Sequence, residues 1–285
     1  MANPIALNGT HYRQERYADT IKKLYRKPTL VRDWFNRDYE GNPVAGAVNV
    51  PVRDTDVSLS TYDVASGITL NQSATTYEQV LINGHVAFNE LIDGYEAQAV
   101  PDNLVAQRME SASYVLGMKL EKDAINELIT NGTTASSTSA STTSTIYGNI
   151  VKEITELKKL GVQPDRIKIV VSADTEALLL SDEKFSNTSG NLGAELVRQG
   201  VIGKINGCEV KMSPVLDEYD NLEFIVFAQD YVYAIDEWKV APAIVDLKDG
   251  AHIGASALQG RIVFKDYIAR ATAVRVKTSG SVVSL

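Results

Sequence analysis

The sequence predicts an α+β fold in which strands and a long helix come first, an α/β region is inserted, and strands close the chain. Three observations support this order. Apolar residues recur with period two in two stretches, before Glu90 and again after Lys239, as expected for half-buried strands. The longest helical pattern, Asp102–Ile129, follows the first stretch. Helix and strand patterns then alternate, which is typical of an α/β unit.

The composition is that of a globular protein. The chain has 285 residues, of which 44% are apolar and 22% are charged, and this balance supports a buried core. No run approaches the ~18 consecutive apolar residues of a membrane span, so we expect no membrane contact. Met1–Pro4 does not resemble the start of a secretory signal, and Cys208 is the single cysteine. We therefore expect folding in a reducing cytoplasm.

Residues 1–46 are predicted to form an N-terminal arm whose charge is opposite to that of the remaining chain. Eight basic and four acidic residues between His11 and Asp38 give this segment a charge of +4, whereas the whole chain carries −8. Such an arm can bind a second copy through charge complementarity, although a solvated polar face is the simpler interpretation. Trp34 and Phe35 could anchor the arm either on its own body or on a neighbouring subunit.

Residues 47–84 are predicted to form an extended two-stranded hairpin. Val48, Val50 and Val52 alternate with small or polar residues, and strand patterns return around Val80. The tip, Thr61–Gly67, is mostly polar or small. An isolated two-stranded ribbon is at best marginally stable, so we expect the hairpin to pack on its own body or to reach another chain.

Residues 85–146 are dominated by the helix at Asp102–Ile129. At 1.5 Å per residue this helix is about 40 Å long, which suits the backbone of a flat, extended subunit. Pro101-Asp102 marks its start and Asn131-Gly132 its end. The Ser, Thr and Ala residues of Thr133–Thr145 predict a mobile surface loop that takes no part in the core.

Residues 147–239 are predicted to form the α/β region, and residues 240–285 return to strands. Ser172 is expected to cap a short helix that extends to Leu180. The other expected elements are a helix at Gly148–Leu160 and strands at Ile167–Val171, Glu209–Met212, Glu223–Phe227, Val232–Ile235, Arg261–Phe264 and Ile268–Lys277.

No group of residues predicts catalysis, a cofactor or a metal. His11, His85 and His252 lie far apart, in no ligand or triad spacing. The glycines at positions 200, 203 and 207 match neither the dinucleotide-binding fingerprint nor the P-loop. The acidic cluster, Asp217, Glu218, Asp220 and Glu223, could bind calcium, but it lacks EF-hand spacing, and a solvated turn is the simpler interpretation.

The order of these elements resembles that of tailed-phage major capsid proteins with the HK97-like fold. The strand Ile167–Val171, the turn Ser172-Ala173-Asp174 and the helix Thr175–Leu180 look like that family's strand, Ser-x-Asp turn and short helix. The glycine-punctuated step from Gly200 to Val210 and the final strand Ala271–Lys277 are also similar. The resemblance covers nearly the whole chain. It implies an arm at 1–46, an extended loop at 47–84, a peripheral domain with a spine helix at 85–146 and 240–285, and an inserted axial domain at 147–239.

The resemblance also implies a structural, non-enzymatic subunit without cofactors. We expect hexamers and pentamers that form an icosahedral phage head around double-stranded DNA, located in the virion capsid after assembly in the host cytoplasm. A portal is implied, and a separate scaffolding protein is expected because the arm begins almost at Met1. The residues expected at intersubunit contacts are Arg13, Arg16, Lys22, Lys23, Arg26, Trp34, Phe35, Asp54, Asp56, Tyr62 and Asp63.

Two alternatives stay open at this point. The first is an encapsulin-like compartment, which has the same fold but encloses cargo protein. The second is a soluble α/β enzyme that acts through Asp174, Glu176 or the acidic cluster.

Overall fold

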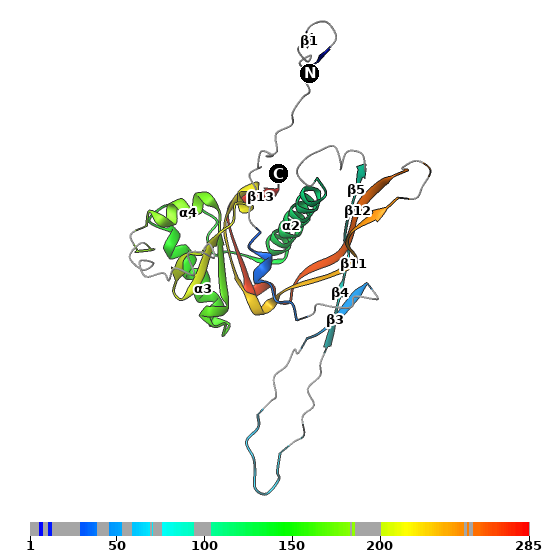
Figure 1. Cartoon of the computed structure of the whole chain (residues 1–285). Coiled ribbons are helices and arrows are strands. Elements are labelled where there is room, and N and C mark those ends of the chain that lie inside the picture. The colour runs from blue at the N-terminus through cyan, green and yellow to red at the C-terminus, as the bar shows by residue number, and fades with distance from the viewer. Residues whose placement is uncertain are drawn as a thin grey trace.

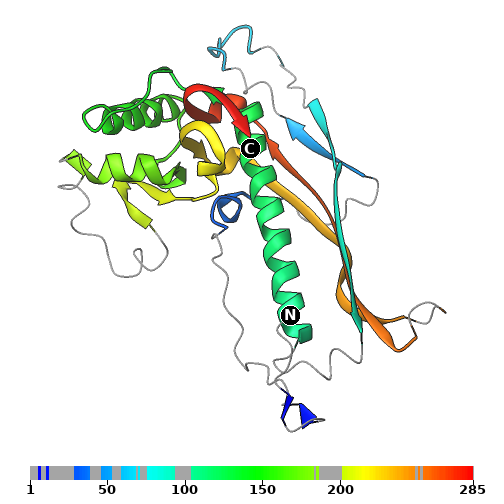
Figure 2. The same ribbon diagram turned by 90° about the horizontal axis from the view of Figure 1, so that it is seen from above.

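The computed structural model describes residues 6–7, 11–12, 29–38, 46–52, 59–68, 70, 76–93, 104–182, 184–185, 201–247, 250 and 253–284. The long helix α2 (Leu104–Asn131) lies between two sheets, and a narrow hairpin extends away from them (Figures 1 and 2). Within the described ranges, no helix is long and apolar enough to cross a membrane. The arrangement is the α+β fold that the sequence predicts.

The larger sheet has six strands and is buried on both faces. Side chains that alternate along its strands pack in two separate cores: Ile169 lies with the helix residue Ile150, whereas Val170 lies with Ile125 of α2. Two further helices, α3 (Ile146–Lys159) and α4 (Ala173–Leu180), contribute to the first of these cores. The strand order is β6 (Thr133–Thr134), β13 (Val274–Ser284), β10 (Tyr219–Ala228), β7 (Ile167–Val171), β9 (Cys208–Met212) and β8 (Val201–Ile205).

The second sheet has three antiparallel strands in the order β11 (Val232–Asp246), β12 (Ala255–Ile268) and β5 (Gly84–Asp93). Helix α2 covers one face of it, where Leu116 packs against Ile262 and Phe264. Arg108 of α2 also pairs with Glu90 of β5 at 2.6 Å, which places the even-numbered residues of β5 on the helix side. The predicted long helix is confirmed, and it joins the two sheets.

The hairpin consists of β3 (Ala47–Val52) and β4 (Thr76–Leu81). Its base packs on the face of the three-stranded sheet that α2 leaves open, where Val50 and Val80 contact a core with Val263. The Tyr267 hydroxyl donates to a Glu78 carboxylate oxygen at 2.6 Å. The base of the hairpin therefore folds on its own body, while the distal part extends beyond it (Figure 1).

The remaining elements are short. An antiparallel pair, β1 (Ala6–Leu7) and β2 (His11–Tyr12), lies near the N-terminus. The 3-10 turns are η1 (Arg32–Trp34), η2 (Pro164–Arg166), η3 (Leu216–Glu218), η4 (Gln229–Tyr231) and η5 (Ala271–Ala273).

The closing segment runs through both sheets. β12 ends in the three-stranded sheet, and β13 enters the six-stranded sheet beside β10. Turn η5 separates them, so the single strand expected at Ile268–Lys277 is wrong. The sequence pattern misses this break because both strands are apolar and no Gly or Pro stands between them. The proposed domain limit between residues 239 and 240 lies inside the continuous strand β11.

The Ser/Thr segment Thr133–Thr145 is part of the folded body, so the prediction of a loop that takes no part in the core is wrong. Its first residues form β6, and Ala135 is buried. Ser141 donates to the Glu223 carboxylate through its backbone nitrogen, at 2.8 Å, and through its hydroxyl, at 2.5 Å. Composition alone does not reveal these partners, which lie on strands distant in the sequence.

Gly132 allows α2 to end tightly against β13, and a methyl group is expected to be poorly tolerated there. A Cβ at this position would stand 2.3 Å from the Leu128 carbonyl oxygen and 2.9 Å from a Val274 methyl carbon. We expect Gly132→Ala to lower the free energy of unfolding by about 2 kcal/mol, as overpacked sites do. Gly148→Ala is the control, because its Cβ meets nothing within 4 Å. Denaturant unfolding of both variants measures the difference, and equal stabilities would contradict the expectation.

Candidate assembly surfaces

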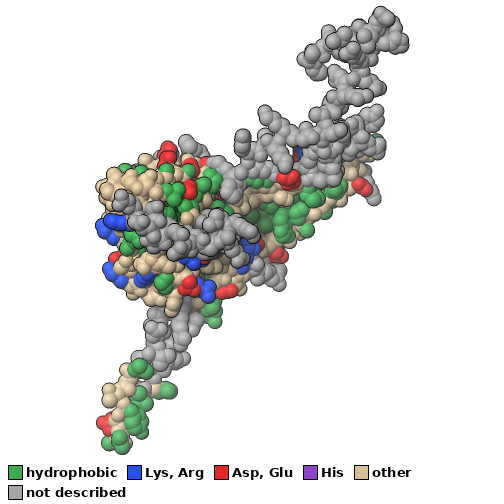
Figure 3. All heavy atoms as spheres, turned by 60° about the vertical axis from the view of Figure 1, so that its left-hand side comes forward, with side chains coloured by type: hydrophobic (Ala, Val, Ile, Leu, Met, Phe, Trp, Pro, Cys, Tyr) green, Lys and Arg blue, Asp and Glu red, His purple; other side chains and the backbone are tan. Residues whose placement is uncertain are grey.

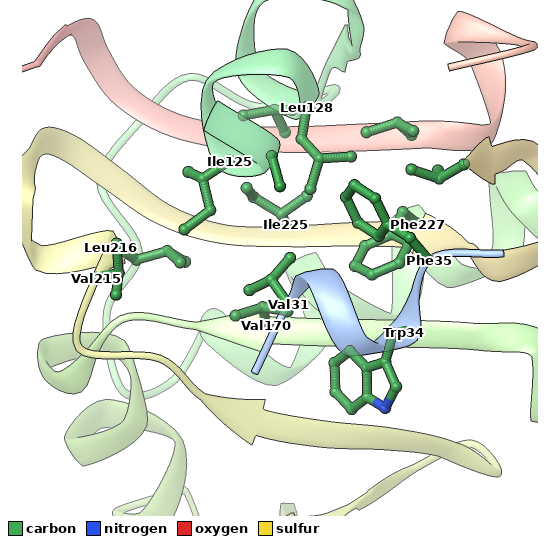
Figure 4. Packing of buried hydrophobic residues seen from close by; sticks show 14 of the residues in the cluster. Val31, Trp34, Phe35, Ile125, Leu128, Val170, Val215, Leu216, Ile225 and Phe227 are labelled. Carbon is green, nitrogen blue, oxygen red and sulfur yellow. The ribbon is translucent and has the colours of Figure 1, made fainter. Parts of the chain in front are cut away.

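The root of the arm, residues 29–38, is built into the chain's own core. Val31, Trp34 and Phe35 are buried, and the Phe35 ring meets the Phe227 ring edge-on with centroids 5.8 Å apart (Figure 4). The Lys211 ammonium lies 4.5 Å from the centroid of the Trp34 ring. The structure thus favours docking on its own body, one of the two alternatives for Trp34 and Phe35, over contact with a neighbouring subunit.

A buried network of charged groups holds this root in place. The carboxylate of Glu121, a residue that is 1% exposed, accepts three backbone N–H groups, from Leu30 at 2.9 Å, Val31 at 2.7 Å and Arg32 at 3.1 Å. The Arg32 guanidinium donates to Asp236 of β11 at 2.6 Å and to Asp266 of β12 at 3.0 Å. We call Arg32, Glu121, Asp236 and Asp266 the arm anchor, because they join the arm root to α2 and to both strands.

The anchor places more negative than positive charge in a buried volume. Burial raises the pKa of Asp266 to about 6 although the Arg32 charge lowers it, and Glu127 and Asp123 raise it further. Burial also raises the pKa of Glu121, against the lowering effect of its three N–H donors. No local sequence pattern indicates this network, since Glu121 and Asp266 lie 89 and 234 residues from Arg32.

The distal hairpin carries large apolar side chains that nothing in the described chain covers. Leu59 and Leu70 are each 96% exposed, and the apolar residues Tyr62, Val64 and Ile68 are also exposed. Apolar side chains gather at the far end of this segment in Figure 3. We call these five residues the apolar tip. The expectation of a mostly polar tip overlooked it, because its apolar residues are spaced irregularly along the chain.

Asp63 has a local structural role in this tip. Its carboxylate accepts the backbone N–H groups of Ala65 and Ser66, and these hydrogen bonds hold the pKa of Asp63 below its usual range. Gly67 donates to the Asp63 carbonyl at 2.8 Å and closes the turn. The other charged residues expected at contacts, Arg13, Arg16, Lys22, Lys23, Arg26, Asp54 and Asp56, lie outside the described residues.

Further apolar side chains are exposed on α2 and on the three-stranded sheet. Met109 and Val115 are exposed on α2, and Leu91 and Val245 lie in one cross-strand row on the sheet face away from α2. Exposed apolar surface of this extent is typical of proteins that bind other proteins. The extended shape and these two surfaces suit a subunit that contacts its neighbours.

Two of the residues considered for catalysis, Asp217 and Glu223, have structural roles. Asp217 accepts the Ala173 backbone N–H at 3.0 Å, at the start of α4. The carboxylate of Glu223 is bound to Ser141, as described above. Ser172 caps α4, as the sequence predicts, by accepting the Thr175 N–H at 3.3 Å. No arrangement of a nucleophile with a base is formed by these groups.

Comparisons with known proteins agree with the geometry. The sequence profile of a family described as phage capsid protein matches residues 95–276. No curated protein matches the sequence. Among solved structures, a chain from Mycobacterium phage Che8 is 21% identical, with a TM-score of 0.73 over 96% of this chain and 99% of that one.

Two more distant structures share the same fold. The capsid of cyanophage P-SCSP1u has a TM-score of 0.74 at 11% identity, over 93% of this chain and 92% of that one. The capsid of an empty GTA particle has a TM-score of 0.68 at 11% identity, over 97% and 98% of the two chains. Each similarity covers more than nine-tenths of this chain, so the HK97-like fold that the sequence suggested is confirmed.

Proposed function

Because this chain belongs to the phage capsid protein family, we propose that hexamers and pentamers of it close into an icosahedral head around double-stranded DNA. The chain is a structural major capsid protein, its copies form an oligomeric shell, and it is located in the virion capsid. The comparisons do not favour an encapsulin-like compartment or a soluble enzyme. We further infer that the protein has no catalytic activity.

The apolar tip is the single observation that carries the proposed mode of assembly. Exposing large apolar side chains to water is unfavourable, and a two-stranded ribbon is marginally stable on its own. Covering these side chains stabilises the protein by roughly 25 cal/mol per Å² of apolar area. Met109 and Val115 of α2 are also exposed apolar residues. In the proposed shell, the apolar tip of one subunit lies over the α2 region of the next.

The remaining partners follow from the same proposal. A scaffolding protein encoded separately would guide the shell to its size, a portal would occupy one vertex, and assembly would take place in the host cytoplasm. The packaged DNA would be contacted non-specifically. Supporting this, the net charge of −8 does not favour a sequence-specific DNA-binding surface, which needs clustered cations.

Hydrogen exchange tests this arrangement. Amides at residues 59–70 should exchange fast in unassembled protein and slowly in shells, because a neighbour then covers them. Amides of the central strand β12 serve as the internal reference, since Ala255–Phe264 lies between two paired strands of the same chain. Equal exchange of residues 59–70 in both states would mean that no neighbour covers the apolar tip.

Substitution at the apolar tip gives a second test. The double variant Leu59→Ser/Leu70→Ser should fold normally, because both side chains are exposed, but should form few or no shells. Ser60→Ala, at a neighbouring exposed position, is the matched control and should assemble normally. Electron microscopy and sedimentation measure the yield of shells. Normal shells from the double variant would exclude the apolar tip as an essential contact.

A further inference from the structure

Asp266 of β12 lies inside the arm anchor with half of its carboxylate unpaired. The residue is 3% exposed, and its Oδ1 accepts the Arg32 Nε–H group at 3.0 Å. Its other oxygen, Oδ2, is buried and has no hydrogen-bond partner among the described residues, and neither has the buried Nη2 of Arg32. The two side chains thus share one hydrogen bond, whereas a bidentate arginine–carboxylate pair has two. The ionised form of Asp266 is therefore only partly satisfied.

The positive charge of Arg32 does not neutralise this site. The guanidinium also donates to Asp236 at 2.6 Å, so one positive charge is shared between two carboxylates. Glu121, the third carboxylate of the arm anchor, binds backbone N–H groups of the arm root. A buried negative charge without full compensation is costly, and a proton removes that cost by making the group neutral.

The carboxylates of α2 act in the same direction. Burial raises the pKa of Asp266 from 3.8 to about 6 against the lowering effect of Arg32, and Glu127 and Asp123 raise it further. Glu127 is itself paired with Lys265 at 3.0 Å, and Asp123 with Lys119 at 2.7 Å. Of these three carboxylates, Asp266 is the one with a buried and unpaired oxygen.

We propose that the arm anchor is a proton-binding site, at which the folded protein takes up one proton on Asp266 in mildly acidic solution. The proton comes from the solvent and forms an O–H bond with the carboxylate, which becomes neutral. Unfolding returns Asp266 to water, where it releases this proton. A carboxyl group whose pKa is higher in the folded state contributes stability below its unfolded pKa and loses it as the pH rises through the folded value. Proton uptake therefore stabilises the fold as the pH falls from about 7.5 toward about 5.

Unassembled full-length protein provides the test, so the outcome does not depend on the proposed shell. Denaturant unfolding gives the ratio of folded to unfolded protein at each pH. From about pH 7.5 to about pH 5.5, this ratio should rise about fourfold more in the parent protein than in Asp266→Asn, which is neutral at both values. Both values lie above the isoelectric point of ≈ 5.0. Equal changes in the two proteins would overturn the proposal.

Asp165→Asn is the matched control. Asp165 is also an aspartate beside an arginine, with 3.9 Å between its Oδ2 and the Nε of Arg166, but its side chain is 77% exposed. This variant should keep the pH dependence of the parent protein. If it lost as much pH dependence as Asp266→Asn, the effect would belong to the removal of any acidic charge, and the proposal would be wrong.

Infrared spectroscopy of the parent protein tests the same proposal without a substitution, in case Asp266→Asn does not fold. The C=O stretch of a neutral carboxylic acid is separate from the bands of ionised carboxylates. In the folded protein one such band should appear with a midpoint near pH 6, where carboxyl groups in water remain ionised. A folded protein in which no carboxyl group gained a proton above about pH 5 would contradict the proposal.

Discussion

Glu121→Ala is expected to lower the free energy of unfolding by about 3–5 kcal/mol. Three backbone N–H groups of the arm root donate to this carboxylate, and alanine would leave them without a partner in a buried site. Denaturant unfolding measures the loss, and the slope of the transition shows whether the arm root has separated from the body.

Two controls make this expectation sharp. Glu156→Ala removes a partly exposed carboxylate from another helix and should leave stability nearly unchanged. Deleting Ala2–Lys27 should leave a folded protein that fails to form shells, whereas a deletion that extends through Asn36 should prevent folding. A stable Glu121→Ala protein, or a folded product of the longer deletion, would mean that the arm root is dispensable.

Replacing residues 135–141 with seven glycines is expected to lower the free energy of unfolding by about 3 kcal/mol or more. Glycine adds backbone entropy to the unfolded chain at each position, and the side-chain hydrogen bonds of the segment disappear. Ser136 donates through its backbone nitrogen and its hydroxyl to the buried Glu153, each at 3.0 Å. The Lys277 ammonium, in a residue that is 1% exposed, donates to the backbone carbonyls of Ser137 and Ser139. Glycine retains these carbonyls, but holding them in place then means ordering a more flexible segment.

Single substitutions separate these contributions. Ser141→Ala removes a hydroxyl bond to the charged Glu223 and should cost about 1–3 kcal/mol. Thr138→Ala, at an exposed position in the same segment, should cost less than about 0.5 kcal/mol. Thermal or denaturant unfolding compares the two. Equal stabilities of both variants and the parent protein would restore the view of a loose loop.

The sequence predicts the elements with strong local signals. Helix α2 is found within two residues at each end, because its apolar residues keep a helical period and clear signals stand at both ends. The cap at Ser172 is also found, since the cap and its partner Thr175 are three residues apart. The base of the hairpin is predicted because Val48 and Val50 alternate with other residues, as in a half-buried strand. In the structure Val48 is paired with Val80 of the neighbouring strand.

The candidate surfaces are predicted only in part. The sequence predicts an extended hairpin with too few apolar residues to form a core of its own. It misses the apolar tip, because Leu59 and Leu70 belong to no helical or strand pattern. The opposite error concerns Trp34 and Phe35. Bulky residues in a charged segment can pack equally well in the core of their own chain or on the surface of a neighbour. Their ring contacts with Phe227 show that Trp34 and Phe35 pack in the core of their own chain.

By itself, the sequence determined the order of the elements, the long helix, the hairpin and the resemblance to capsid proteins, because each depends on residues that are near one another in the chain. The tertiary structure alone decided which charged groups are partners. Arg32 meets Asp266 across 234 residues, and Lys277 reaches Ser137 across 140. A charged residue has the same local pattern whether it is solvated or buried, so the partner that offsets its desolvation is known only once the chain is folded.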